Sequence, residues 1–451
     1  MKYGIVPVTA ALLFQSVSGP SLFGQSKDPG LRGPVKPVFM VTPIGGMSAS
    51  ESALFQLGVA EFRIFNSVMG GPNGPLNKQT SAGLGPRFNS VSCGECHVQP
   101  THGGSSAPVT NQAQLVSGVN TDYGILAPGQ TNPSFLQRNG PSFAVRFKYN
   151  PDHTRDGGVH QLFTISGRSD APGCNIPQPD FATQFQSRNV SIRITTPTFG
   201  AGLIEAIPDS TILSNKNSSL PAKMALGISG HENRDPHNAL IAKFGWKAQI
   251  RALRDFTAEA YRNEMGVTND TFTVENDLTP ACQFNSGLDD KPFQTPQGIQ
   301  TRVDIVNTFM RFLAPPARGT ATASVNNGQS VFQNTGCVMC HTPVMNTGSS
   351  TSPALANKPV NLYSDLLVHH MGQGLMDDII QGSAGVDEFR TAPLWGLGQR
   401  TFFLHDGRTS DLKAAIAAHA GTGSEANQVV ANWNVLTETL KQDLLNFLRS
   451  L

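Results

Sequence analysis

The sequence predicts a mainly α-helical protein with two domains, long loops and a few short strands. Apolar residues recur at helical spacing in two stretches, within 54–65 and within 436–451. The 451 residues exceed one ordinary domain, and 45 glycines and 31 prolines predict extensive loops. Hydrophobic residues make up 39 % of the chain, enough to form a core, which excludes a mainly disordered protein. Because 33 Lys and Arg nearly balance 32 Asp and Glu, nucleic acid is not expected as the main partner.

The first residues have the pattern of a secretory signal peptide over 1–24. Met1-Lys2 gives a positive start, an uncharged stretch runs from Tyr3 to Phe14, and small residues lead to a candidate cleavage site near Gly24. The alternative is a short membrane anchor, but the apolar run is shorter than the roughly 20 residues that a spanning helix needs. We therefore expect export to the periplasm and no transmembrane segment.

Several elements follow in order along the first half. Ser48 and Glu51 form a capping-box pattern that predicts the start of a helix. The residues expected along one face of that helix are Leu54, Leu57, Glu61, Phe62 and Phe65. Phe143–Phe147 and Val190–Ile194 alternate like short strands, and Ala248–Tyr261 is expected to be helical.

A domain boundary is expected near residue 320, where Ala314-Pro-Pro breaks the pattern. Clusters of Pro, Gly, Ser and Thr predict loops over 25–47, 315–327 and 346–360. Gly328–Gln333 predicts a short helix, and the apolar stripe at 436–451 predicts a terminal helix that packs on it. The domains are therefore 25–320 and 321–451.

Two pentapeptides carry the chemistry of the chain. Cys93-Gly-Glu-Cys96-His97 and Cys337-Val-Met-Cys340-His341 both have the C-x-x-C-H attachment pattern of c-type haem. Two thiols one helical turn apart can bond the two vinyl groups of one porphyrin, and the next residue, His97 or His341, can then bind the iron. The sequence thus predicts two covalently bound haems, in two cytochrome-c-like domains.

Two other uses of a C-x-x-C motif are possible. A redox-active pair would need a βαβ context, which neither site shows. A zinc site would need four ligands pooled from both motifs, whereas an exported protein reaches a compartment where haem is attached. The two remaining cysteines, Cys174 and Cys282, are expected to form a disulfide in such a compartment, with two buried free thiols as the alternative.

The second axial position of each iron separates electron transfer from catalysis. His419 ends the Ala-rich helix that starts near Ser410, so its imidazole can reach an iron across a packed core. Met371 is the rival ligand, and a solvated histidine at a helix end is the other alternative.

The chain resembles the bacterial di-haem oxidoreductases (thiol oxidoreductase-like), relatives of the di-haem cytochrome c peroxidases, over nearly the whole mature chain. The matching segments are Phe88–His97, Gly157–Phe163, Thr196–Pro208, Phe244–Gln249, Glu264–Gly266, Phe389–Gly398 and His405–Arg408.

The resemblance implies roles for individual residues. It places His419 at the sixth ligand of the second iron, where most peroxidases have Met, so this haem should have a lower potential. It makes Trp246 the electron relay between the haems and Glu264 the acid/base over the peroxide. Glu205, an acid in an apolar run, is a second acid/base candidate.

For the distal face of the first iron, the candidates are His160, His153 and His102. His160 is preferred because its Gly-Gly-Val-His setting belongs to the family pattern, and an open or water-bound face is the alternative. A calcium ion between the domains is a further implication of the resemblance.

Together these features predict an exported di-haem oxidoreductase of the peroxidase type. Hydrogen peroxide, or another small oxidisable substrate, would react at the N-terminal haem, with electrons relayed from the C-terminal haem and supplied by a donor protein. The alternative is a di-haem electron-transfer cytochrome without catalytic activity.

Overall fold

The computed structural model describes residues 25–33, 40–64, 84–107, 112, 132–137, 139–164, 166–168, 171–283 and 287–451. The expected signal peptide over 1–24 lies outside the described residues, as does Phe65. No helix within the described ranges is both long enough and apolar enough to cross a bilayer.

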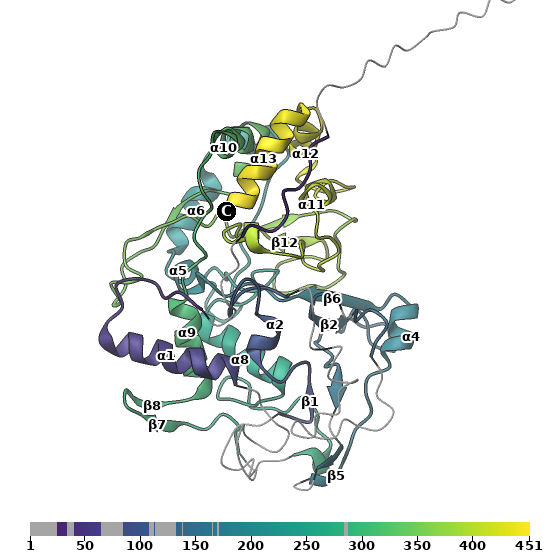
Figure 1. Ribbon diagram of the computed structural model, residues 1–451. Helices are drawn as coiled ribbons and strands as arrows, with labels where there is room; N and C mark the ends of the chain where they lie inside the picture. Colours follow the sequence, from purple (N-terminus) through teal and green to yellow (C-terminus); the bar gives the residue numbers. More distant parts are fainter. Residues whose placement is uncertain are drawn as a thin grey trace, which may run out of the picture.

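Helices and long loops dominate the described chain (Figure 1). The α-helices are α1 Ala49–Arg63, α2 Cys93–Cys96, α4 Phe181–Gln186, α5 Ala201–Glu205, α6 Asp209–Asn217, α7 Leu220–Ala225, α8 Leu253–Met265, α9 Arg302–Phe312, α10 Ala323–Thr335, α11 Leu412–Ala418, α12 Asn427–Asn434 and α13 Glu438–Ser450. Short 3-10 helices are η2 Pro280–Cys282, η3 Cys337–Met339 and η4 Leu397–Gln399.

The strands are short and form two-stranded antiparallel ladders in the described residues. The pairs are β1 Arg87–Phe88 with β3 Phe163–Thr164, β2 Phe143–Phe147 with β6 Val190–Ile194, β4 Ser166–Arg168 with β5 Ala171–Asn175, β7 Phe293–Thr295 with β8 Gly298–Gln300, β9 Met345–Asn346 with β10 Pro359–Val360, and β11 Val368–His370 with β12 Glu388–Arg390. The two strands predicted from alternation, β2 and β6, are confirmed and pair with each other.

The first haem motif is framed by the helix pair α1 and α9. The predicted capping box at Ser48 and Glu51 is present and starts α1. Gly58 lets the two helices touch, because a Cβ there would lie 2.6 Å from the Ile305 carbonyl oxygen. The buried face of α1 is Phe55, Gly58 and Phe62. Phe62 is confirmed, whereas Phe55 and Gly58 are buried in place of the predicted Leu54 and Leu57, because α9 packs on that side.

The second haem motif is framed in the same way by α10 and α13, which lie side by side in Figure 1. Both helices were predicted, and their packing on each other is confirmed. The predicted loop over 315–327 is too long, because α10 already begins at Ala323, where the Thr322 side chain caps it. A Cβ on Gly328 would lie 2.0 Å from the Asp443 carbonyl oxygen, so only glycine fits the crossing. Phe332 packs on Phe447 with ring centroids 5.3 Å apart, as Phe62 packs on Phe309 at 4.7 Å.

The hydrophobic core has two main clusters. The smaller cluster contains only residues from Val325 to Leu451, whereas the larger one extends from Phe55 to Trp395 and includes Met345 and Leu367. The chain after residue 320 therefore contributes to both clusters, and the domain boundary near 320 stays a prediction.

Two other expectations are decided by local geometry. The helix expected from Ala248 begins only at Leu253, because Ala248 adopts a left-handed conformation in a turn that bridges Phe244 to Ile250. Cys174 and Cys282 form the expected disulfide, which links β5 to η2 across 108 positions of sequence.

Candidate haem sites

The first pentapeptide forms α2 and ends at its iron-ligand candidate. The side chain of Ser92 caps the helix by accepting from the backbone N–H of Gly94. His97 follows at the C-cap, and its Nδ1 donates to the Gly104 carbonyl oxygen at 3.1 Å. The remaining nitrogen, Nε2, is free to bind a metal. Both cysteines and His97 line a cavity of about 160 Å³, the first cavity.

The second pentapeptide repeats this arrangement on η3. His341 Nδ1 donates to the Tyr363 carbonyl oxygen at 3.0 Å. Cys337, Cys340 and His341 line a cavity of about 220 Å³, the second cavity. A backbone carbonyl thus fixes the ring and the tautomer of each proximal histidine candidate, which is typical of metal-binding histidines.

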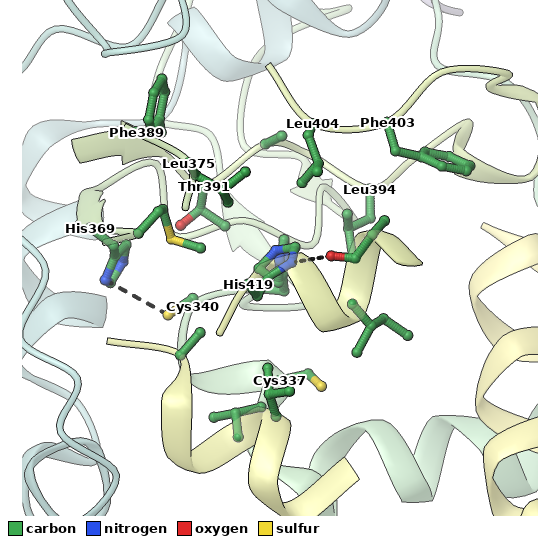
Figure 2. Close-up of a pocket in the computed structure, with 18 of the residues that line it drawn as sticks. Cys337, Cys340, His369, Leu375, Phe389, Thr391, Leu394, Phe403, Leu404 and His419 are labelled. Atoms are coloured by element: carbon green, nitrogen blue, oxygen red, sulfur yellow. Dashed lines mark hydrogen bonds between the residues drawn. The ribbon is translucent and has the colours of Figure 1, made fainter. Parts of the chain in front are cut away.

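His419 reaches the same cavity as His341. It caps α11, and its Nδ1 donates to the Ala415 carbonyl oxygen at 2.7 Å, which again leaves Nε2 available. Figure 2 shows His419 beside Cys337 and Cys340. Met371 also lines this cavity. The structure therefore brings both sequence candidates for the sixth ligand to one site, with the imidazole already oriented by a hydrogen bond.

The protonation of these histidines suits metal binding. Burial lowers the pKa of His97 and of His341 to about 4, and burial also lowers the pKa of His419. All three rings are therefore neutral near pH 7, which is the form that coordinates a metal.

The geometry does not favour zinc. The two cysteine pairs line different cavities, so they do not pool four ligands. Within the described residues, one group of potential ligands converges: Cys340, Asp365 and His369. His369 is already held between Asp365 at 2.9 Å and Glu425 at 2.7 Å. Calcium prefers oxygen ligands, so this group offers no calcium site either, and calcium stays a prediction.

The residues around both cavities fit a porphyrin with acidic side groups. The second cavity is lined mainly by apolar side chains, including Leu375, Leu394 and Phe403, and buried arginines lie in its wall. In the first cavity, Arg146 donates from Nη1 to the Gly157 carbonyl oxygen, while its buried Nε has no hydrogen-bond partner. Glu259 and Glu264 of the same cavity partly balance the charge of Arg146, and its free Nε can bind a further anion.

Trp246 lies between the two sites. Its side chain lines both cavities and a smaller pocket between them, and its Nε1 donates to the Ile194 carbonyl oxygen at 2.9 Å. Beside it, His405 stacks on Phe389 with ring centroids 4.2 Å apart and meets Trp246 edge-on at 6.3 Å. Trp246 is thus in contact with both cavities, and its role as an electron relay stays a prediction.

Glu264 lines the first cavity, as the resemblance implies. Its Oε2 accepts from Asn89 Nδ2 at 2.8 Å. Burial raises the pKa of Glu264, although the Asn89 hydrogen bond opposes this shift. Glu259 lines the same cavity, and burial raises its pKa too. Glu259 was not predicted from the sequence. Its place on α8, five residues before Glu264, is the one feature that could have drawn attention to it.

Glu205 lies away from both cavities. Its Oε1 accepts from the backbone N–H of Leu253 at 2.9 Å, at the start of α8, and its Oε2 pairs with Arg311 at 3.0 Å. These contacts explain how an acid is tolerated in an apolar run. They give Glu205 a structural role and argue against the predicted role in proton transfer.

The candidate distal histidines of the first iron do not line the first cavity. His160 stacks on Phe147 at 3.8 Å, and its Nε2 contacts Asp156 at 2.8 Å. His153 is exposed, and His102 lies against Gly94 of α2. His160 thus lies outside the first cavity with its ring held by other partners, and its role as a ligand stays a prediction.

An aromatic ring lies beside each proximal histidine candidate. The ring centroid of Phe332 in α10 lies 6.3 Å from that of His341, and the ring centroid of Phe62 in α1 lies 5.9 Å from that of His97.

Comparison with known families gives one match. The profile described as "Di-haem oxidoreductase, putative peroxidase" matches residues 158–451. This range includes Trp246, Glu264, Cys337–His341 and His419, whereas Cys93–His97 lies before it. No curated protein matches the chain.

Solved structures resemble the chain only distantly. Hydrazine synthase of Kuenenia stuttgartiensis has 14 % identity and a TM-score of 0.37, covering 99 % of this chain and 100 % of that one. A variant of the diheme peroxidase BthA from Burkholderia thailandensis has 13 % identity and a TM-score of 0.36, covering 95 % and 91 %. A MauG-like protein associated with microbial copper homeostasis has 16 % identity and a TM-score of 0.29, covering 56 % and 89 %. Scores this low carry no argument.

Proposed function

The chain belongs to the di-haem oxidoreductase family, and on that premise we propose that it is an exported, peroxidase-like enzyme of the periplasm with two c-type haems. The haems are attached at Cys93–Cys96 and at Cys337–Cys340, with His97 and His341 as proximal ligands. One observation supports different roles for the two sites. Four histidines line the second cavity, and two of them, His341 and His419, leave Nε2 free, whereas His97 is the only histidine among the described residues that line the first.

Haem iron, when bound, supplies a centre for peroxide reduction in the first cavity and an electron reservoir in the second. The residues of the first cavity position and move protons. With haem in place, Glu264 would take the proton of a bound peroxide and return it to the departing oxygen, while Asn89 holds the carboxylate in place. Burial raises the pKa of Glu264 above that of an ordinary carboxyl, which favours a group that must both accept and return a proton.

Trp246 is the proposed path for the electron that the second site delivers. Its indole is in contact with both cavities, and its hydrogen bond to Ile194 fixes the ring. The donor is a redox protein that reduces the second site, and calcium between the two halves is an additional proposal.

The optical and electron paramagnetic resonance spectra of the purified holoprotein test this function. We expect one low-spin haem with two imidazole ligands and one high-spin haem whose spectrum changes with peroxide. Two low-spin haems that ignore peroxide, before and after partial reduction, would make the protein an electron carrier. In that case Met265 or Met310, both in the wall of the first cavity, would be the sixth ligand to test.

A further inference from the structure

Two arginines in the wall of the second cavity lack the partner that a buried charge needs. Arg390 lies at the end of β12, and Arg400 follows η4. Their side chains line both the second cavity and the smaller pocket that contains Trp246. Arg390 is 8 % exposed and Arg400 is 7 % exposed, so water does not solvate either guanidinium well.

Among the residues that the structure describes, no carboxylate lies within ion-pair distance of either group. Arg390 Nη1 donates to the Lys243 carbonyl oxygen at 2.9 Å, but its buried Nε has no hydrogen-bond partner. The equally buried Arg449 shows what is missing, because its Nε and Nη2 each contact Asp28 at 2.7 Å. Burying a charge without a counter-charge costs several kcal/mol.

Both groups nevertheless remain cations. Burial lowers the pKa of Arg390 and of Arg400 to about 10, and the charge of Arg400 also acts on Arg390. Two neighbouring positive charges, buried beside an apolar cavity, create a site for an anion with two carboxylates or for two anions. Planar guanidinium groups bind carboxylates in a two-pronged geometry.

We propose, resting on the proposed function, that Arg390 and Arg400 bind the two propionate carboxylates of the porphyrin in the second cavity. A porphyrin attached at Cys337 and Cys340 carries these carboxylates on the edge opposite its apolar rim. The arginines then act as positioning residues. Their positive charge favours the reduced metal and raises its potential, which partly offsets the low potential of bis-imidazole ligation.

The test uses the holoprotein with Arg390→Gln and Arg400→Gln, compared with Arg449→Gln as the matched control. Arg449 is also buried and does not line the second cavity, and because its Nη1 donates to the Arg400 carbonyl oxygen at 3.1 Å, this control also measures any effect that passes through the Arg400 backbone. The readout is the reduction potential of the low-spin haem, measured by spectroelectrochemistry. We expect the potential to fall in each cavity variant and to stay near the wild-type value in the control. Equal potentials in all four proteins would overturn the proposal.

A second pair of variants keeps the test decisive if the glutamine variants do not fold. Arg390→Lys and Arg400→Lys keep the charge but lose the planar fork, so the propionate bending modes in the resonance Raman spectrum should shift. Unchanged modes would overturn the assignment. The arginines could bind a free carboxylate anion in place of the propionates. A saturable change of the wild-type reduction potential with added acetate would show this and overturn the assignment to propionates. If the wild-type protein has no haem in the second cavity, it is the proposed function that fails.

Discussion

At the residue scale, the same kind of hydrogen bond orients each histidine that is a candidate metal ligand. His97, His341 and His419 each donate Nδ1 to a backbone carbonyl and present Nε2 toward a cavity. The identities of these residues followed from the sequence, because C-x-x-C-H names its own histidine and His419 ends a recognisable helix. The carbonyls that orient the rings could not be predicted, since Gly104 and Tyr363 come from loops without a pattern.

Glu264 gives the sharpest test of proton transfer. Glu264→Gln should lower the peroxide-dependent rate by about 10²–10⁴-fold, because the amide can neither take nor return the proton. Glu205→Gln is the control, since Glu205 lies outside both cavities. Stopped-flow mixing with peroxide measures the effect, and equal rates for the wild type and Glu264→Gln would remove the role.

The pH profile of the same reaction follows from the sign of the pKa shift. Glu264 must be ionised to accept the first proton, so the wild-type rate falls as the pH drops through its pKa. Because burial raises that pKa, the fall occurs at a higher pH than for an ordinary carboxyl. Glu264→Gln should lack this limb of the profile.

Trp246 gives a test of the relay. Trp246→Phe keeps an aromatic ring of similar shape but loses the hydrogen bond to Ile194 and is harder to oxidise. Both haems should keep their resting spectra, while the response of the second haem to peroxide slows. Trp433→Phe is the control, because Trp433 is buried in the wall of the second cavity only. A response as fast as that of the wild type would exclude the indole as the path.

The two helix crossings matter most at the element scale. Gly328→Ala should destabilise the protein by about 1–3 kcal/mol, because the new methyl group would overlap the Asp443 carbonyl oxygen and push α10 from α13. Gly374→Ala is the control, since nothing lies within 4 Å of a Cβ there. Urea unfolding followed by circular dichroism measures both, and similar midpoints would mean that the crossing adapts at no cost.

The elements themselves were largely predictable. A capping box with apolar spacing predicted α1, apolar spacing predicted α13, and alternation predicted β2 and β6. Only the middle of α10 was predicted, from its place before the second pentapeptide. The start of α8 was predicted too early, because the left-handed Ala248 that delays it is set by tertiary contacts rather than by propensity. The sequence also gave no sign of Glu259, Arg390 and Arg400. These residues line cavities whose walls are built from segments far apart in the chain, so no local pattern marks them.

At the scale of the whole molecule, the start of the described chain is tied to its end. Ser26 contacts Glu438 at 2.7 Å, and Asp28 binds both Arg449 of α13 and the backbone N–H of Leu412 in α11. The sequence predicted only a loop over 25–47 and gave no sign of this contact, because ion pairs 421 residues apart leave no local pattern.

Asp28→Asn tests how much these contacts between the two ends of the described chain stabilise the protein. Removing one partner of a buried ion pair costs about 3–5 kcal/mol, so we expect a loss of that order near pH 7. Burial alone would raise the pKa of Asp28, but the hydrogen bonds from Arg449, Gly30 and Leu412 lower it overall. Its contribution is therefore present above the usual pKa of Asp and is lost as the pH falls through the lowered value.

Asp270→Asn is the matched control for that variant. Asp270 pairs with Arg254 at 2.8 Å on the surface, where an ion pair contributes only about 0–1 kcal/mol. Thermal unfolding at several pH values compares the two variants. Equal losses of stability in both variants would contradict a stabilising role for the Asp28–Arg449 ion pair. A loss in Asp28→Asn that does not shrink in acid would contradict it too.

The central claim is that each pentapeptide carries a covalently bound porphyrin. Intact-protein mass spectrometry under denaturing conditions, on protein produced from the full sequence in a host that attaches haem, tests this most directly. We predict a mass increased by two haem groups, falling to one when Cys93 and Cys96, or Cys337 and Cys340, are both replaced by Ala. A polypeptide that emerges at its unmodified mass, with any pigment lost on denaturation, would contradict the account.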